Sequence, residues 1–381
     1  MHRIQYQTIT ENDPKNMSEQ LEFTISSVND RQFIDLYNSY ISFDYIIESN
    51  FITAATFNVK PFGTTLSGIF EQCNLDLIYI DNQGTLQNGT FESILYAPDY
   101  RQIIGALTTE HLKQGFERDD GNTFLFKKSS AKIYDENIKF TKINEKNCAV
   151  YRCRIPFRYL FELANNEFNT INFKEINFKM RFKDPFKYIC EYNSTTNTYY
   201  IKSDSSIVPT NFLYDNVKVM YHYYQDLEPS PAISCELKNT PMQAFRFPLG
   251  TNNFVKKQLL MNDVYRYLMI FCTVEPDNFT VLAENKLQKI TMGSQGKSFF
   301  SEVITDDLAW DYTTFCINSG KHSCINKGIY YKDHFLVLPL DEIIDYDAPS
   351  FLDFEIRYFT NDAAVPPVKT SGTLHLLFFG K

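Results

Sequence analysis

Apolar and polar residues alternate with a period of two through much of the chain, which is the pattern of half-buried β-strands. In "INFKMRFK", residues 176–183, every second residue is apolar. The same alternation occurs at 21–26, 40–47 and 217–224. We therefore expect strands in all four places, each with one face toward a core.

The second half of the chain repeats the pattern of the first. In each half an apolar segment runs into a proline, Pro156 or Pro339, followed by a short apolar cluster, a polar gap and an alternating strand. Each half then ends on an apolar stretch, "NVKVMYHYY" in the first and "TLHLLFF" in the second. This repeat predicts two β-domains of similar build.

Prolines and polar stretches define the predicted boundaries. The first 20 residues are polar and include Pro14, so 1–20 is expected to be an N-terminal arm. The stretch "LEPSPAISCELKNTP" contains three prolines, and we expect a linker over 227–239. The two domains are then predicted at 21–226 and 240–381. Helical spacing at 97–116 indicates one of the few inserted helices.

Composition and charge limit the kinds of protein that the sequence can encode. The 34 Phe and 25 Tyr residues favour strands. A net charge of −9 argues against a protein that coats nucleic acid, and the basic pairs Lys127–Lys128 and Lys256–Lys257 are expected to be solvated. No apolar stretch is long enough to span a membrane, and the N-terminus lacks the apolar segment of a signal peptide. We expect a protein kept in the cytosol or nucleus.

The spacing of the cysteines indicates no disulfide framework, and the glycosylation motifs carry no functional meaning. In a reducing compartment the thiols are expected to be free and mostly buried. The eight cysteines are Cys73, Cys148, Cys153, Cys190, Cys235, Cys272, Cys316 and Cys324. Sequons begin at Asn16, Asn88, Asn193 and Asn278 and are interpreted as chance matches in an Asn-rich chain.

Two segments are compatible with chemistry, and each has a simpler interpretation. "MGSQGKSFF" contains GKS, but Thr291 occupies the position of the first glycine of a phosphate loop, so a turn between strands is favoured. "CINSGKHSC" offers Cys316, His322 and Cys324 without the paired spacing or fourth ligand of a zinc site.

The remaining chemical candidates are acidic pairs and histidines. The pairs Asp306–Asp307 and Asp341–Glu342 could serve glycoside hydrolysis but are expected to be solvated. The six histidines form no metalloprotease motif. We predict no enzyme, no catalytic, metal or cofactor-binding residues, and no cofactor.

The order of segments resembles a known family. "FTISSVNDRQFIDLYNSYISFDYII", "FGTTLSGIFEQCNLDLIYI", "CRIPFRYLFELANNEFNTINFKEINFKMRFKDPFKYI" and "FLYDNVKVMYHYY" are similar to the first jelly roll of double jelly-roll major capsid proteins. These come from Polinton-like and adintovirus-like DNA viruses, in the wider lineage of adenovirus hexon and iridovirus capsid proteins. "FPLGTNNFVKKQLLMNDVYRYLMIF" and "FLVLPLDEIIDYDAPSFLDFEIRYF" resemble parts of the second jelly roll. The resemblance covers nearly all of residues 21–381.

The resemblance implies an all-β fold of two tandem eight-stranded jelly rolls with a few short helices. It further implies a major capsid subunit of an icosahedral shell, assembling as homotrimeric, hexon-like capsomers with neighbouring capsomers, penton and minor capsid proteins. Such a virion protein is made in the host cytoplasm or nucleus and does not bind nucleic acid by sequence. Two alternatives stay open. One is a scaffold or minor capsid protein of the same fold, and the other is a tandem β-sandwich that binds or cleaves glycans.

Overall fold

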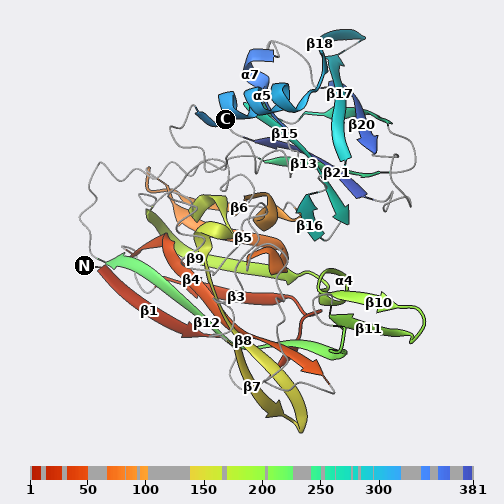
Figure 1. Cartoon of the computed structure of the whole chain (residues 1–381). Coiled ribbons are helices and arrows are strands. Elements are labelled where there is room, and N and C mark those ends of the chain that lie inside the picture. Colours follow the sequence, from red (N-terminus) through yellow and green to blue (C-terminus); the bar gives the residue numbers. More distant parts are fainter. Residues whose placement is uncertain are drawn as a thin grey trace. The chain divides into compact units, whose positions relative to one another are not determined.

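The computed structural model describes most of the two predicted domains. The residues it describes are 2–9, 14–27, 32–49, 67–81, 83–91, 95–101, 138–164, 170–201, 205–225, 242–249, 254–261, 263–275, 278–281, 285–294, 296–318, 336–343, 351–360 and 372–379. The chain divides into two compact units, with the described residues up to 225 in the first and those from 242 onward in the second. Strands make up most of both units (Figure 1). The expected linker, 227–239, lies outside the described residues.

The first unit contains eight strands in two four-stranded layers, plus additions at their borders. The strands of the layers are β1 (His2–Thr8), β3 (Leu21–Ser26), β4 (Gln32–Ser49), β5 (Phe70–Ile80), β6 (Leu86–Phe91), β8 (Lys146–Pro156), β9 (Thr170–Phe182) and β12 (Pro209–Gln225). The additions are β2 (Lys15–Asn16), β7 (Ile138–Ile143) and the ribbon of β10 (Cys190–Asn193) and β11 (Thr198–Ile201). The helical turns are η1 (Ser67–Ile69), η2 (Phe157–Tyr159), η3 (Glu162–Ala164) and α4 (Pro185–Tyr188).

Pairing in the first unit has a specific order. One layer reads β1-β12-β4-β8 and the other β3-β9-β5-β6, with all pairs antiparallel. If the eight strands are numbered along the chain, these orders are 1-8-3-6 and 2-7-4-5, the arrangement of a jelly roll. A short pairing of β4 with β9, from Phe33 to Asp35, joins the layers at one corner.

The second unit repeats this topology. Its strands are β13 (Gln243–Leu249), β14 (Phe254–Leu260), β15 (Tyr267–Glu275), β17 (Asn285–Ser294), β18 (Lys297–Val303), β19 (Leu336–Pro339), β20 (Phe351–Thr360) and β21 (Gly372–Phe379). The layers are β13-β21-β15-β19 and β14-β20-β17-β18, again 1-8-3-6 and 2-7-4-5. A short strand, β16 (Asn278–Val281), pairs with the end of β15. The helix α7 (Leu340–Ile343) follows Pro339 just as η2 follows Pro156, so the predicted repeat is confirmed.

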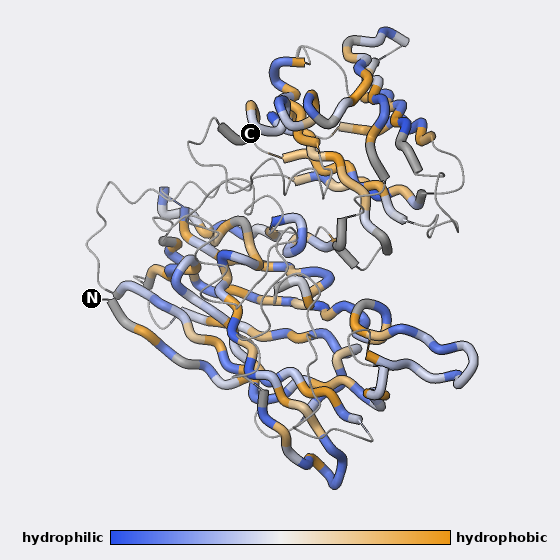
Figure 2. Tube along the Cα trace, viewed as in Figure 1, coloured by the Kyte–Doolittle hydropathy of each residue, from blue (hydrophilic) through white to orange (hydrophobic). Residues whose placement is uncertain are grey.

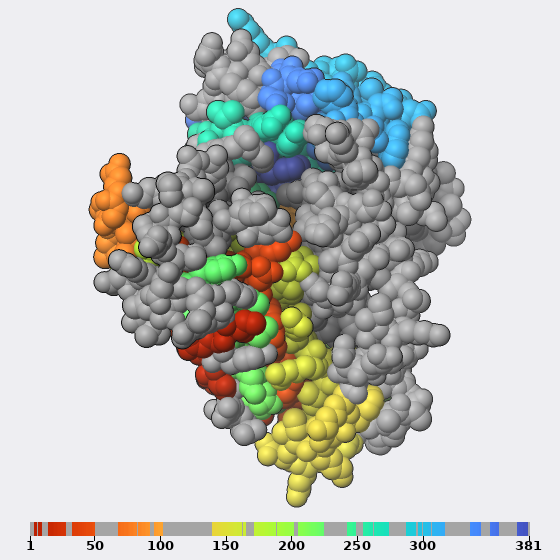
Figure 3. All heavy atoms as spheres, turned by 90° about the vertical axis from the view of Figure 1, so that its left-hand side faces the viewer, coloured from red at the N-terminus to blue at the C-terminus, as the bar shows by residue number. Residues whose placement is uncertain are grey.

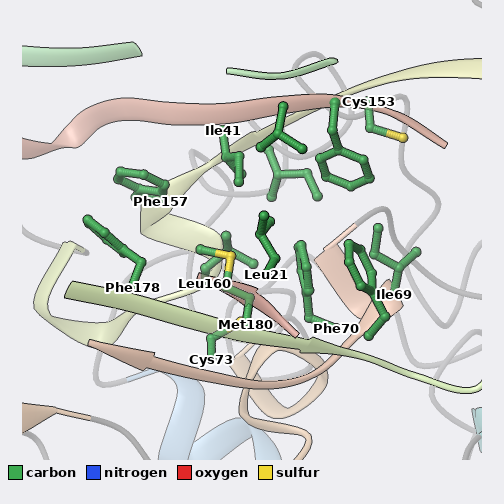
Figure 4. Close-up of a cluster of buried hydrophobic side chains, with 14 of the residues drawn as sticks. Leu21, Ile41, Ile69, Phe70, Cys73, Cys153, Phe157, Leu160, Phe178 and Met180 are labelled. Carbon is green, nitrogen blue, oxygen red and sulfur yellow. The ribbon is translucent and has the colours of Figure 1, made fainter. Parts of the chain in front are cut away.

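The register predicted for the strand at 176–183 is confirmed in β9. Ile176, Phe178 and Met180 are buried, whereas Asn177 and Lys179 are partly exposed. Phe178 stacks on Phe23 and Phe157, with ring centroids 4.6 and 4.9 Å apart. Figure 4 shows Phe178 and Phe157 facing each other between the layers, and Figure 2 shows hydropathy alternating along the strands.

Lys183 departs from the alternating pattern, because it lies just past the end of β9. We expected its side chain to be on the polar face, but it is only 5 % exposed. Its ammonium lies 2.8 Å from Asp99, which is itself buried at the start of a helical segment, 97–101. The part of the predicted 97–116 helix beyond 101 lies outside the described residues.

The expectation of an N-terminal arm over 1–20 is wrong. Residues 2–8 form β1, which pairs with β12 from His2 opposite Tyr224 to Thr8 opposite Lys218. Without β1, the long strand β12 would expose an unpaired edge next to the core, which folded proteins avoid. The alternation of Ile4 and Tyr6 with glutamines was the available signal, hidden by the overall polarity of the segment.

A helix that the sequence analysis missed connects β18 to β19. It is α5, Asp306–Asn318. Thr305 caps it, because its Oγ1 accepts a 3.2 Å hydrogen bond from the Leu308 backbone N–H. Ala309, Thr313 and Cys316 share its buried face at helical spacing. That spacing was visible in the sequence, but the neighbouring strands dominated the interpretation.

Candidate functional site

The segments that resembled chemical motifs have structural roles where they are described. The GKS residues belong to the hairpin of β17 and β18, in which Ser294 pairs with Lys297. Gly296 has a φ of +79°, a conformation that glycine adopts without strain. This is the predicted turn between strands and not a helix N-terminus that could hold a phosphate.

The described thiols are all buried. Cys73, Cys148, Cys153, Cys190, Cys272 and Cys316 are buried reduced thiols, as expected. Burial raises the pKa of Cys272 to about 12, and burial together with the Asp341 and Glu342 carboxylates raises the pKa of Cys316 to about 12. A nucleophilic or metal-binding thiol needs the opposite shift. His322, Cys324 and Cys235 lie outside the described residues.

No group of three or more His, Cys, Asp or Glu side chains that could hold a metal ion occurs among the described residues. In the same part of the chain, no helix is long and apolar enough to cross a membrane.

His375 is a strongly perturbed base among the described residues of the second unit. Its ring is fully buried in β21 and stacks on Phe271 with centroids 4.6 Å apart, and its Nε2 lies 2.8 Å from the Thr273 hydroxyl. Burial, followed by the charge of Arg246, lowers its pKa to about 3. The ring is therefore neutral at ordinary pH and belongs to the core.

The acidic pairs lie at helix starts. Asp307 falls in the first turn of α5, and Asp341 and Glu342 in the first turn of α7, where carboxylates interact favourably with the helix dipole. Asp341 also accepts a hydrogen bond of 3.2 Å from Arg266. These positions give the two pairs a structural reason that does not require catalysis.

Among the sequons, Asn193 caps the turn of the β10–β11 ribbon. Its side-chain oxygen accepts hydrogen bonds from the backbone N–H groups of Thr195 and Thr196. Asn16 likewise accepts from the N–H of Ser18. Asn88 is exposed on β6, and Asn278 begins β16. Turn formation accounts for two of the four positions.

Large apolar side chains are exposed on the outer face of one layer of the second unit. Leu260 on β14 and Phe351 on β20 are directly paired, and both are about half exposed. Phe254 lies at the other end of β14, with the Arg357 guanidinium 5.6 Å from its ring centroid. Such side chains on a folded surface are typical of protein–protein contacts.

A second aromatic surface lies on the β10–β11 ribbon of the first unit. Tyr192 and Tyr199 face each other across the two strands with ring centroids 5.1 Å apart, and both are exposed. Phe186 of α4 contacts Tyr199 edge to face at 5.3 Å, which supports the ribbon on one side. Figure 3 shows two further exposed edges of the first unit, the orange segment that includes β6 and the yellow β7–β8 hairpin.

Comparison with known proteins identifies the architecture. No family model and no curated protein sequence matches the chain. A solved structure of the Sputnik virophage contains a chain that matches over 99% of this chain and 85% of its own length, with 10% identity and a TM-score of 0.59. The mavirus major capsid protein matches over 98% of this chain and 86% of its own, with 8% identity and a TM-score of 0.50.

The fold is a double jelly roll. Both matches extend over nearly the whole chain, so they include both units and not one isolated sandwich. The strand orders worked out above give the same result independently. The fold that the resemblance implied is therefore confirmed, with two tandem eight-stranded jelly rolls and few helices.

Proposed function

We propose that the protein is the major capsid subunit of an icosahedral DNA virus. The observation that carries this proposal is the match of a virophage chain to 99% of this double jelly roll and to 85% of its own length, with a TM-score of 0.59. Jelly rolls occur in both capsid and lectin domains, so one jelly roll alone does not distinguish a capsid protein from a sugar-binding protein. Two tandem jelly rolls in a chain of this length favour a capsid protein.

In the proposed assembly three chains form a closed ring. Each chain supplies two jelly rolls of the same topology, so three chains place six similar units around a threefold axis. Such a ring approximates a hexagon and can tile a shell, and threefold closure is an ordinary solution for a homo-oligomer. Permanent interfaces of this kind bury roughly 2,000–5,000 Å² and are rich in aromatic residues. The exposed Tyr192, Tyr199 and Phe254 suit such contacts.

The proposal extends to partners and location. The partners are other copies of the chain, with penton and minor capsid proteins at special positions of the shell. The protein is made in the host cytoplasm or nucleus and resides in the virion. Residues 227–239 serve as the linker between the two jelly rolls. No catalytic residue, metal or cofactor takes part.

The mass of the purified protein in solution tests the proposal. Light scattering after size exclusion is expected to give a species near three times 44.5 kDa, about 134 kDa. A strict monomer across micromolar concentrations contradicts the capsomer. In that case a glycan screen tests the remaining alternative, a tandem sandwich that binds or cleaves sugars.

A further inference from the structure

The jelly-roll topology gives the second unit two distinct lateral ends. Its layers read 1-8-3-6 and 2-7-4-5, so strands 1 and 2 lie at one end and strands 5 and 6 at the other. At the first end, Gln243 of β13 donates a 3.1 Å hydrogen bond to the Leu260 carbonyl of β14. At the second end, Tyr312 of α5 contacts Phe300 of β18, and the Cys316 thiol lies 3.6 Å from the Val337 carbonyl of β19.

These two ends carry opposite charge. The strands β13 and β14, here called the basic end, contain Arg246, Lys256 and Lys257 and no carboxylate. The elements β18, α5 and α7, here called the acidic end, contain one lysine and six carboxylates. The carboxylates of the acidic end are those of Glu302, Asp306, Asp307, Asp311, Asp341 and Glu342.

The neighbours of each end modify the charge without reversing it. Next to the basic end, Glu355 of β20 lies opposite Lys256, but Arg357 lies on the same strand, 3.5 Å from Glu355. Next to the acidic end, Arg266 pairs with Asp341 at 3.2 Å. Lys256, Lys257, Glu302 and Asp311 are all exposed.

Carboxylates of β18 and α7 lie close enough to α5 to act on its side chains. Burial and then the Glu302 charge raise the pKa of Tyr312, and the Asp341 and Glu342 charges add to burial in raising that of Cys316. Asp311 projects from the exposed face of the same helix. One turn further along that face, Phe315 is 55 % exposed. The acidic end therefore combines negative charge with an uncovered aromatic ring.

The basic end has a matching composition. Phe254 at the start of β14 is 41 % exposed, and the Lys257 ammonium lies 5.5 Å from the ring centroid of Phe247 on β13. β14 pairs with β20 on one side, and no other strand in the described part of the chain pairs with it. Cations over and beside aromatic rings can receive both the carboxylates and the ring of α5.

We propose that the second unit binds the second unit of a chain in a neighbouring capsomer head to tail, with the acidic end of one on the basic end of the other. The occupant is a second copy because one chain carries both complementary surfaces, and they lie at opposite ends of one unit and so cannot meet within it. A heterologous contact of this kind repeats from copy to copy. The inference deepens the proposed self-assembly and rests on it. It identifies the surfaces and the electrostatic force that joins them.

Charge reversal of the full-length protein tests the contact. The basic-end variant is Lys256→Glu with Lys257→Glu, the acidic-end variant is Glu302→Lys with Asp311→Lys, and a third protein combines all four changes. The matched control is Lys15→Glu with Lys218→Glu, which reverses two partly exposed lysines of the first unit, on β2 and β12. Sedimentation velocity over a concentration series measures association, and circular dichroism verifies that each protein is folded.

Each double reversal should weaken association by about tenfold or more, because like charges then face each other. The combined protein should return to within about threefold of the wild type, and the control should match the wild type. Association should also weaken at about 1 M salt, where the screening length is ~3 Å. Unchanged association in either double variant, or no recovery in the combined protein, overturns the inference.

The outcomes separate this inference from the capsomer. A wild type that forms no species above the threefold mass, or larger species that form equally well in all variants, refutes the head-to-tail contact and leaves the capsomer in place. Association that is lost and recovered by charge, but in species that are not multiples of three, supports the contact and refutes the threefold capsomer.

Discussion

Phe178 lies at the centre of the first unit's core, and its replacement tests the register on which the whole fold assignment rests. The ring is completely buried and stacks on Phe23 and Phe157, with Phe161 edge-on at 5.5 Å. Truncating a buried phenylalanine costs about 3–5 kcal/mol. The lost aromatic pairs place Phe178→Ala toward the upper part of that range.

Phe178→Asp should be more severe and abolish folding of the first unit. It adds the burial of a carboxyl group, which costs several kcal/mol more. Domains are typically stable by about 5–15 kcal/mol, so the sum reaches the whole stability of an ordinary domain. Phe178→Ala should fold with a lowered urea midpoint, and Phe178→Asp should fail to form a soluble capsomer.

The assay can separate the two units. Trp310 is the one tryptophan of the chain and lies in α5 of the second unit, so its fluorescence follows that unit, whereas far-ultraviolet circular dichroism follows both. Tyr192→Ala, an exposed aromatic truncation in the first unit, is the control and should cost about 1 kcal/mol or less. A soluble, assembled Phe178→Asp protein with the wild-type spectrum would refute the assigned register.

Three further perturbations have expected outcomes. The pKa of His375 is about 3 in the folded state against an ordinary 6.5. Burial of the neutral ring therefore contributes fully to stability above pH 6.5, and the free energy of unfolding falls by about 1.4 kcal/mol per pH unit as the pH drops toward 3. His375→Gln should flatten this dependence of the unfolding free energy on pH, followed by Trp310 fluorescence, and an unchanged slope would contradict the reasoning. Its polar neighbours include Thr273, whose hydroxyl lies 2.8 Å from Nε2, and Arg246, which lies opposite it on β13. Lys183→Met leaves the buried Asp99 carboxylate without its lysine and should destabilise the first unit by about 3–5 kcal/mol in urea melts, with Lys179→Met as the partly exposed control. Gly296→Ala should cost about 1 kcal/mol through backbone conformation alone, because no atom lies within 4 Å of the added Cβ, and a neutral result would show that the turn is not left-handed.

The core strands were predictable because burial on one face of a strand imposes a strict period. That period is visible at 21–26, 176–182 and 217–224, and β3, β9 and β12 cover these positions. The period does not identify a strand whose side chains are only partly buried. β1 is such a strand, since Ile4 is 53 % exposed, and its pairing depends on β12, more than 200 residues away in sequence.

Lys183 and α5 show two other limits of sequence patterns. A lysine next to an alternating strand is expected to face solvent, and only the position of Asp99, 84 residues away, explains its burial. The α5 helix buries one narrow face and exposes acidic and aromatic residues on the other, so its apolar pattern is weak. The two lateral ends were likewise beyond prediction, because their charges gather from separate segments only after the layers have formed.

The two units share a topology but differ in charge at corresponding positions, and this difference bears on assembly. At the end of the first unit that corresponds to the acidic end, β7 and β8 carry Lys139, Lys142 and Lys146, of which Lys146 pairs with Glu48 at 2.9 Å. At the same position the second unit has the carboxylates around α5. A partner surface that favours one of these ends must disfavour the other, since like charges placed together cost several kcal/mol. We therefore expect two units of nearly equal shape to occupy distinct positions in the assembly, which would make the proposed ring of six jelly rolls threefold and not sixfold.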